Sequence, residues 1–490
     1  MSHARWCWSL AILLTLWGLS ARHADAAGRD RPNILVVLCD DLGYGDLGCF
    51  GHPVIKTPNV DRLASEGLRL TSCYSAAANC SPARAGLMTG RTPYRVGVYS
   101  QLPMLVPLHL RQQEITIATL LKQQGYQTCH VGKWHLNGMF NFPVQPQPND
   151  HGFDHWMSTQ NNCLPNHHDP YNFVRNGIPL GPVKGYASQI VADEAIRWLK
   201  DRDASKPFFM YCSFHEPHEP IATDPRFQAM YRNPDDPSTQ DYYGNVSQMD
   251  ESLGRILDEL DREQLRDNTL VWFTSDNGPA RTRWHTAGSA GGLREFKGHV
   301  YEGGIRVPGI VRFPGVVESG RTSDVPVSGL DFLPTVCAIT GIAPPNDRTL
   351  DGANVTPLLK GNTFQREKPL YWQFNFTPSK PKVAMRWGDW KILAGLDAPT
   401  GKMFDEQFFQ TLKHGSLKDF ELYNLANDIG ETRDLASSEP EQLAAMTAAL
   451  EKMYRDVQQE GPMWPTWVDP GYEQKRIVWP DYTAKQFKKK

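Results

Sequence analysis

A nearly continuous apolar run, Asn33-Ile34-Leu35-Val36-Val37-Leu38-Cys39, leads directly into Asp40 and Asp41. Runs of this length and composition are typical of strands that are buried on both faces, as in a parallel sheet. Segments with helical periodicity separate this run from three similar ones, which are Tyr126 to Val131, Pro207 to Phe214 and Thr269 to Ser275. The alternation predicts an α/β fold with a large mixed, mostly parallel sheet flanked by helices.

Each of the four predicted strands ends in side chains that suit a metal or an anion. In chain order these are Asp40 and Asp41, then Lys133 and His135, then His215, then Asp276 and Asn277. Any one of these ends could be an ordinary polar loop, since Asp-Asn-Gly is a common turn. Because ligands bind beyond the carboxyl ends of strands in such sheets, four ends with complementary chemistry favour one shared site.

The candidate residues supply three kinds of chemistry. Oxygen-bearing side chains suit a hard cation, calcium or magnesium, better than zinc. Arg84, Lys133 and Lys297 supply positive charge for an anionic substrate, and His135 and His215 can move protons near neutral pH. A nucleophile is still required, and Cys80, at the start of a helix-forming run, is the candidate. These parts together describe the hydrolysis of a sulfate or phosphate ester.

Four motifs resemble those of the type I sulfatases in the alkaline phosphatase superfamily. Cys80-x-Pro82-x-Arg84, extended by Leu87 to Arg91, is similar to the sulfatase signature. The other three are Gly132-Lys133-Trp134-His135-Leu136, Arg31 to Ile34 leading into Asp40 to Gly43, and Lys297 to Pro308. Within the family, the overall pattern is most similar to that of N-acetylgalactosamine-6-sulfatase and arylsulfatase A.

The resemblance implies a modified nucleophile. A formylglycine-generating enzyme would oxidise Cys80 to Cα-formylglycine, whose hydrate attacks sulfur. Arg84 and Lys133 would assist the attack, and His215 and Lys297 would hold the sulfate and protonate the leaving alcohol. His135 would then act as the base that releases sulfate.

The resemblance also implies a cation and a substrate class. Calcium is favoured over magnesium, with Asp40, Asp41, Asp276, Asn277 and the modified Cys80 as its ligands. The expected substrate is an aryl sulfate or a sulfated sugar of the glycosaminoglycan or algal-polysaccharide type.

Several alternatives remain open from the residues alone. The same machinery could hydrolyse a phosphonate or phosphate monoester, or the chain could be a catalytically silent carbohydrate-binding homologue. Cys80 could be a free thiol, half of a disulfide, or the nucleophile of a thiol protease, which would need a supported histidine nearby. His218 could contact substrate or only support the site. The cysteines form no CxxC pair, so a zinc site is not expected.

The chain divides into three predicted parts. Residues 1–27 are typical of a secretory signal, with an apolar core from Trp8 to Leu19 and a small-x-small site at Ala24-Asp25-Ala26, although a retained anchor is the alternative. Export to the periplasm or the medium is therefore expected, without a stable membrane span. A catalytic domain over 28–345 precedes a C-terminal subdomain and tail over 346–490, with a small antiparallel sheet and one packed helix, Pro440 to Gln458.

Composition and the variable loops bear on the ligand. The formal net charge is −3, which gives no sign of a basic face for nucleic acid. The loop from Asn141 to Pro182 is expected to overhang the pocket and shape specificity. A cluster at Arg281, Arg283, Trp284 and His285 suits a charged sugar ring or is a solvated loop. The tail from Trp464 to Lys490 is expected to be a wrapped or partly frayed terminus.

Overall fold

The computed structural model describes residues 31–232, 236–282 and 285–480. The predicted signal segment therefore lies outside the described residues. Within them, no helix has both the length and the apolar character needed to cross a membrane.

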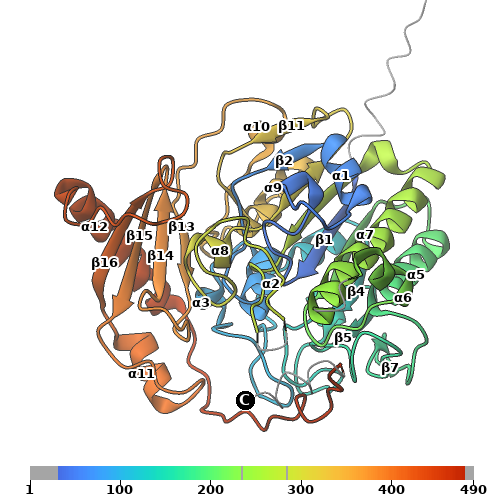
Figure 1. Cartoon of the computed structure of the whole chain (residues 1–490), viewed down its shortest axis with the longest axis horizontal. Helices are drawn as coiled ribbons and strands as arrows, with labels where there is room; N and C mark the ends of the chain where they lie inside the picture. Colours follow the sequence, from blue (N-terminus) through green and yellow to red (C-terminus); the bar gives the residue numbers. More distant parts are fainter. Residues whose placement is uncertain (1–30, 233–235, 283–284, 481–490) are drawn as a thin grey trace, which may run out of the picture.

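A ten-stranded sheet forms the centre of the molecule (Figure 1). Its strands lie in the order β11-β2-β10-β9-β1-β8-β4-β5-β6-β7. The four strands predicted to carry the chemistry are adjacent in the middle of this sheet, and all four are parallel to one another. They are β9 (Thr269–Ser275), β1 (Asn33–Asp40), β8 (Phe208–Pro217) and β4 (Gln127–Lys133).

The outer strands make the sheet mixed. On one side, β10 (Gly309–Arg312) is antiparallel to β9, and β2 (Leu68–Leu70) and β11 (Arg321–Ser323) follow. On the other side, β5 (His155–Thr159) continues the parallel order, and β6 (Val174–Arg175) and β7 (Ile178–Pro179) close the edge as antiparallel strands. A separate two-stranded sheet pairs β3 (Cys73–Tyr74) with β12 (Val327–Ser328). The predicted mixed, mostly parallel sheet is confirmed.

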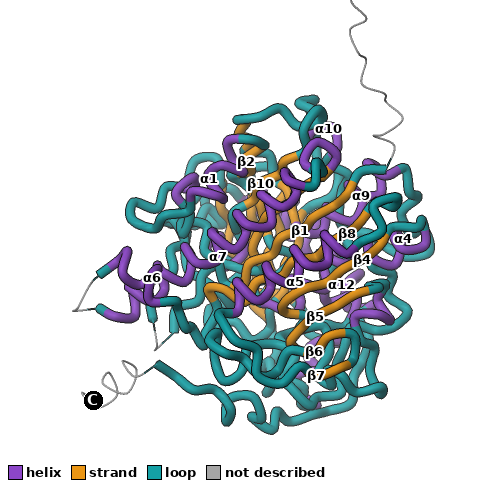
Figure 2. Tube along the Cα trace, turned by 90° about the vertical axis from the view of Figure 1, so that its right-hand side faces the viewer, coloured by secondary structure: helices purple, strands orange, loops and turns teal. Residues whose placement is uncertain are grey.

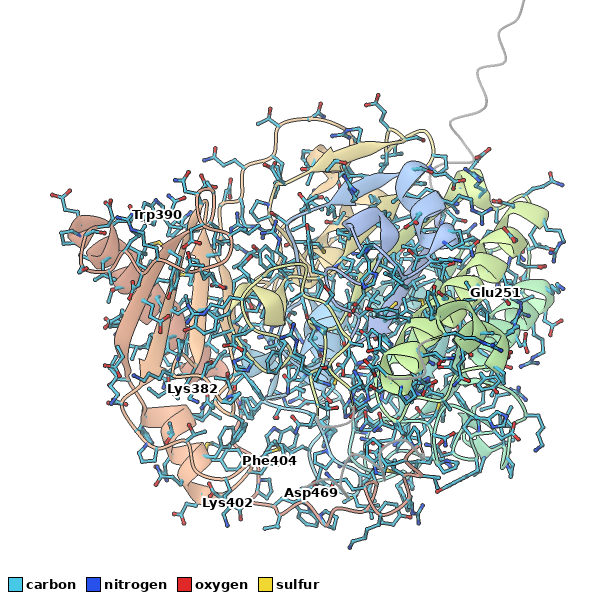
Figure 3. The ribbon with its side chains drawn as sticks, in the orientation of Figure 1. Glu251, Lys382, Trp390, Lys402, Phe404 and Asp469 are labelled. Atoms are coloured by element: carbon cyan, nitrogen blue, oxygen red, sulfur yellow. The ribbon has the colours of Figure 1, made fainter. Side chains whose placement is uncertain are left out.

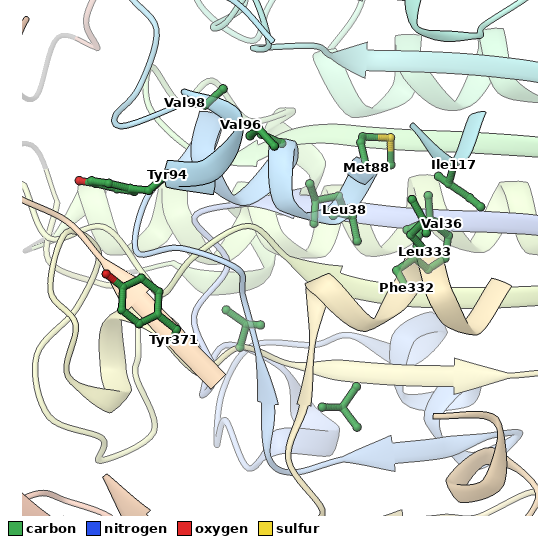
Figure 4. Packing of buried hydrophobic residues seen from close by; sticks show 14 of the residues in the cluster. Val36, Leu38, Met88, Tyr94, Val96, Val98, Ile117, Phe332, Leu333 and Tyr371 are labelled. Atoms are coloured by element: carbon green, nitrogen blue, oxygen red, sulfur yellow. The ribbon is translucent and has the colours of Figure 1, made fainter. Parts of the chain in front are cut away.

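Helices cover both faces of the sheet, which explains why the sequence of β1 is apolar at successive positions. Leu35 and Val37 lie in one core cluster, beneath α1 (Pro58–Ser65), α5 (Ala187–Asp201) and α7 (Pro237–Arg262) (Figure 2). Val36 and Leu38 lie in the other cluster, with residues of α2 (Cys80–Thr89), α4 (Ile117–Gln123) and α9 (Phe332–Thr340) (Figure 4). Because alternate side chains of a strand point to opposite faces, both sets must be apolar.

Short helices complete the connections: α3 (Pro93–Val96), α6 (Pro225–Gln228), α8 (Glu302–Ile305) and α10 (Thr356–Leu359).

The C-terminal region forms the second sheet that the sequence predicts. Its four antiparallel strands are β13 (Leu370–Gln373), β14 (Val383–Trp387), β15 (Trp390–Leu396) and β16 (Leu417–Asn424). The predicted helix is present as α12 (Pro440–Glu460), and α11 (Glu406–His414) is an additional helix between β15 and β16. Buried Lys391 joins this sheet to α8, because its Nζ lies 3.0 Å from Glu302 Oε1.

The chain after α12 returns to the large sheet. We call residues 462–480 the C-terminal strap; this segment contains no helix or strand. The indole Nε1 of Trp464 donates to Gly97 O at 2.8 Å, and the amide of Trp467 donates to Phe404 O at 3.0 Å. Farther along, the amide of Val478 donates to Pro165 O at 3.0 Å. The strap therefore wraps along the molecule from the vicinity of α11 to the loop that follows β5 (Figure 1).

Candidate active site

The carboxyl ends of the four central strands bring the predicted site residues together. Asp40 is the last residue of β1 and Lys133 is the last residue of β4, while Asp276 directly follows β9. Gly132, beside Lys133, has a φ of 100°, and a Cβ there would lie 1.8 Å from Ser213 O of β8. Only glycine permits this close approach of the two strands, which brings Lys133 to the same sheet edge as the end of β1.

Three buried or half-buried cations each pair with one of three carboxylates. Lys133 Nζ lies 2.6 Å from Asp40 Oδ2, and Lys297 Nζ lies 2.7 Å from Asp41 Oδ1. Arg84, from α2, donates to Asp276 Oδ2 from Nη2 at 2.7 Å and from Nε at 3.1 Å. Its Nη1 also donates to Lys133 O at 3.1 Å, which links α2 to the end of β4.

Burial and charge act in opposite directions on these carboxyl groups. Burial raises the pKa of Asp276 to about 7, with the neighbouring Asp40 charge adding to the effect. Burial also acts to raise the pKa of Asp40, but the charge of Lys133 outweighs it and holds that pKa well below its usual value. Three carboxylates at one place in a protein interior repel one another, so additional positive charge at this point is favourable.

Two carboxylates of one largely buried group supply oxygen donors that fit a hard cation, and the predicted ligand Asp276 lies outside that group. Ligand atoms of Asp40, Asp41, Cys80 and His218 all lie within 4.8 Å of one another. Asp40 Oδ1 is buried without a hydrogen-bond partner, although Arg84 Nη2 lies 3.5 Å from it, and such an atom is free to face an ion. Asn277 directs its Nδ2, and not its oxygen, to Asp41 Oδ1 at 2.7 Å; rotating this amide would turn its oxygen toward Asp41.

Cys80 begins helix α2 at the centre of this group. Its side chain is buried, and burial raises its pKa to about 12 although Lys133 and Lys297 act to lower it. The thiol is therefore protonated at neutral pH and is a weak nucleophile as it stands. Among the described residues, no histidine hydrogen-bonds to its sulfur, which is not the arrangement that a thiol protease requires.

The two predicted histidines are buried, and each keeps one ring nitrogen without a hydrogen-bond partner. His135 Nε2 donates to Leu102 O at 3.2 Å, which leaves Nδ1 as the unpartnered acceptor. His215 Nε2 lies 2.7 Å from Thr159 Oγ1, whose own proton goes to Asn161 O, so Nε2 is the donor here too. Burial lowers the pKa of both histidines well below its usual value, so both are neutral and their Nδ1 atoms carry a lone pair.

The comparison with protein families identifies this arrangement. The family model described as Sulfatase matches residues 32–342, and a model described as N-sulphoglucosamine sulphohydrolase, C-terminal, matches residues 295–460. The chain belongs to the sulfatase family. Its relatives, which match most of its length, are sulfuric ester hydrolases, and this chain is one too.

Human N-acetylgalactosamine-6-sulfatase is 36% identical over 371 residues, which cover 70% of this sulfatase and 68% of the relative. Human arylsulfatase A is 33% identical over 483 residues, covering 87% and 89%. Among solved structures, Ps i-CgsB in complex with k-i-k-neocarrahexaose has a TM-score of 0.77 at 29% identity and covers 93% of this chain and 99% of that one. The PsFucS1 sulfatase from Pseudoalteromonas sp. has a TM-score of 0.73 at 25% identity, covering 90% and 93%.

A pocket of about 490 Å³ opens onto the sulfatase site. Its inner end is lined by His135 and His218, and His218 Nε2 lies 3.6 Å from Asp41 Oδ2. The remaining lining comes from residues 101–104, Asn161, Asn162, Glu219 and six residues of the strap: Asp469, Gly471, Glu473, Gln474, Ile477 and Trp479. The structure thus places His218 beside the carboxylates, while the sequence left open whether it contacts substrate or supports the site.

Sequence reasoning located only part of this pocket. Of the long loop from Asn141 to Pro182, only Asn161 and Asn162 line it, and the strap was not expected there at all. Within the Arg281–His285 cluster, Arg283 and Trp284 lie outside the described residues. Arg281 instead stacks on Phe296, with 5.6 Å from its guanidinium carbon to the ring centroid, and His285 faces Glu219.

Thr159 and Ser213 were also missed, although both contact predicted site residues. Thr159 hydrogen-bonds to His215, and the Ser213 hydroxyl accepts from Arg84. The strand pairing could have found Thr159, because it lies opposite Lys133 in the register of β4 and β5.

Proposed function

We propose that this protein is an exported sulfatase that hydrolyses sulfate esters of carbohydrates through a formylglycine at position 80. The observation that carries the proposal is the arrangement around Cys80, where three cations, each paired with a carboxylate, and an acidic cation site lie next to His218, a histidine that lines the pocket. A sulfate ester carries one negative charge spread over three oxygens. Because the three cations are paired with three carboxylates, the surplus positive charge that such a group requires would come from the ion in the cation site.

Cys80 is the residue to be modified. Oxidised to Cα-formylglycine and hydrated, it would supply one hydroxyl for attack on sulfur and a second whose deprotonation expels sulfate. A formylglycine-generating enzyme is the maturation partner that this chemistry requires. The raised pKa of the unmodified thiol supports the view that this cysteine does not act as a thiolate.

A calcium ion held by Asp40, Asp41, Asp276, Asn277 and the modified residue 80 would contribute positive charge next to the sulfate oxygens. Magnesium is the less favoured ion. The chain's own cations complete the binding of the anion. Lys133 and Arg84 lie within this group, and Lys297 extends toward solvent with a half-buried side chain.

Proton transfer falls to residues at the pocket's inner end. Burial acts to lower the pKa of Lys297, but the Asp41 charge outweighs it and raises that pKa well above its usual value. Lys297 is therefore an ammonium that can hold the sulfate and supply a proton to the leaving alcohol, and His215 would share this role only with its ring protonated at Nδ1. His135, neutral and with Nδ1 unpartnered, is placed to accept the proton whose removal releases sulfate.

The names of the relatives support a carbohydrate substrate. Ps i-CgsB was solved with a neocarrahexaose, and two relatives are named for the 6-sulfate of N-acetylgalactosamine and for aryl sulfates. A sulfated sugar of glycosaminoglycan or algal-polysaccharide type is consistent with these names. Export rests on the sequence of residues 1–27.

The proposal is tested by measuring the release of sulfate from an aryl sulfate and from a panel of monosulfated sugars, by ion chromatography. An aryl phosphate serves as the comparison. We expect sulfate release with a strong preference over phosphate. A clear preference for the phosphate ester would overturn the assignment in favour of a phosphomonoesterase.

A further inference from the structure

The C-terminal strap forms the outer wall of the pocket, and specific bonds hold it there. Glu473 Oε2 accepts from Asn161 Nδ2 at 2.8 Å, and Glu473 Oε1 accepts from the amide of Asn162 at 3.0 Å. Beyond it, Asn166 Nδ2 donates to Val478 O at 3.3 Å. The strap is therefore attached to the loop that follows β5 at two places, Glu473 and Val478.

The charge of this wall is opposite to that of the cation proposed for the site at the inner end. Among the described lining residues, every charged side chain is acidic: Glu219, Asp469 and Glu473. The basic residues of the strap do not line the pocket, and Arg476 stacks over the Tyr472 ring at 3.7 Å. Glu219 accepts from the hydroxyl of Thr282, so the charges on which this argument rests are Asp469 and Glu473.

The two strap carboxylates occupy different positions. Asp469 is exposed on the segment that passes below the large sheet in Figure 3. Its Oδ1 accepts from the amide of Gly471 at 2.8 Å, which leaves its other oxygen for the pocket or solvent. Glu473 is more enclosed, and both of its oxygens are held by the Asn161–Asn162 pair.

The remaining strap residues of the wall are uncharged. Ile477 and Trp479 offer apolar surface, and Gln474 offers an amide. Apolar faces and hydroxyl groups are the two features that a neutral pyranose ring presents, and aromatic and amide side chains suit them.

From the acidic character of this wall we infer that the C-terminal strap determines substrate specificity. Asp469 and Glu473 select sugars that carry one sulfate and no second anionic group within the pocket. The inference rests on the proposed function, because it assigns the sulfate to the cationic inner end. A second sulfate or a carboxylate on the same sugar would face the acidic wall, whereas a hydroxyl or an ammonium group would be accepted there.

The test compares monosulfated sugars with the same sugars bearing a second sulfate. For each variant we take the ratio of kcat/KM for the disulfated member to that for the monosulfated member. Asp469→Asn removes one charge and keeps the oxygen that accepts from Gly471, whereas Glu473→Gln removes one charge and keeps only one of two accepting oxygens, so the Tm of each variant is measured alongside. We expect each substitution to raise the ratio about five- to tenfold. This factor corresponds to the loss of the repulsion between two unit charges about 7 Å apart at an effective dielectric of about 40. The matched control is Glu318→Gln, an 80% exposed carboxylate outside the pocket, which should leave the ratio unchanged.

Binding to Cys80→Ala protein, measured by calorimetry, gives a second readout that does not depend on turnover. We expect the monosulfated sugar to bind more tightly than the disulfated one, and the difference to shrink in the Glu473→Gln background. Equal ratios in the wild type and both strap variants, with sulfate still released, would overturn this inference and leave the proposed function intact. Release of no sulfate from any sugar or aryl sulfate would overturn the proposed function, and this inference with it.

Discussion

At the inner end of the pocket the reacting groups stand at the ends of four adjacent parallel strands, whereas at the mouth the lining comes from loops and from a strap that follows the last helix. The inner residues are held by sheet pairing and by buried ion pairs, such as Arg84 with Asp276. The mouth depends on a few hydrogen bonds, such as those of Glu473. On the proposed function the difference separates two tasks, since the sheet edge would position the chemistry and the returning chain would select the sugar that reaches it.

The largest expected effect is at the nucleophile. Cys80→Ser should lower steady-state turnover by about 10⁴-fold or more, because a serine sulfate ester has no second hydroxyl to expel sulfate. A rapid-quench assay should show at most one sulfate transferred per enzyme. Cys49→Ser, at a partly exposed thiol outside the site, is the control and should retain activity. Sustained multiple turnover by Cys80→Ser would contradict the proposed mechanism.

The cation site comes next. Removing calcium with a chelator should abolish activity, and calcium should restore it. Asp40→Asn should lower kcat by about 10³-fold, because it removes a ligand charge and unpairs buried Lys133. Calcium should also raise the Tm of the Cys80→Ser protein but not that of Asp40→Asn, since only a bound ion stabilises the folded state. Asp193→Asn, at an exposed carboxylate, serves as the control. If calcium raised the Tm of Asp40→Asn as much as it raises that of the wild type, the ion would have to bind elsewhere.

Shortening the strap compares the two regions directly. Ending the chain at Val468 removes the pocket wall but keeps the anchors at Trp464 and Trp467. We expect kcat/KM for a sulfated sugar to fall about 10- to 100-fold and that for a small aryl sulfate to fall much less, because a small substrate needs little of the wall. Circular dichroism and the Tm would verify that the shortened protein is folded. An equal loss for both substrates would show that the strap supports the inner end rather than the mouth.

The smallest effect is expected at Thr159, which positions His215. Thr159→Val removes one hydrogen bond and should lower kcat/KM about five- to tenfold, the size of a net contribution of about 1 kcal/mol. Thr159→Ser should restore the rate, since it keeps the hydroxyl. The pH profile distinguishes positioning from a purely structural role, because only a change at His215 would shift it. A Val variant with wild-type rate and pH profile would remove Thr159 from the site.

The inner end could be predicted from the sequence, and the mouth could not. Asp40, Lys133 and Asp276 follow apolar runs, and a parallel sheet places such ends at one edge whatever the loops do. Thr159 was missed because it ends a strand without a distinctive motif, and its role depends on its register with Lys133. The strap was missed because nothing local in Asp469 or Glu473 indicates where a segment without helix or strand will run. Its position depends on long-range contacts, such as that of Val478 with Pro165.

The central claim is that Cys80 does not act as a cysteine, and mass spectrometry of the peptide that contains it tests this most directly. The protein would be prepared from its own host, or from a host that supplies a formylglycine-generating enzyme, and digested without a reducing step. We predict a peptide whose residue 80 has changed from a CH₂SH to a CHO side chain and which reacts with an aldehyde-specific hydrazide. A fully active protein in which residue 80 is only an unmodified thiol would contradict the account.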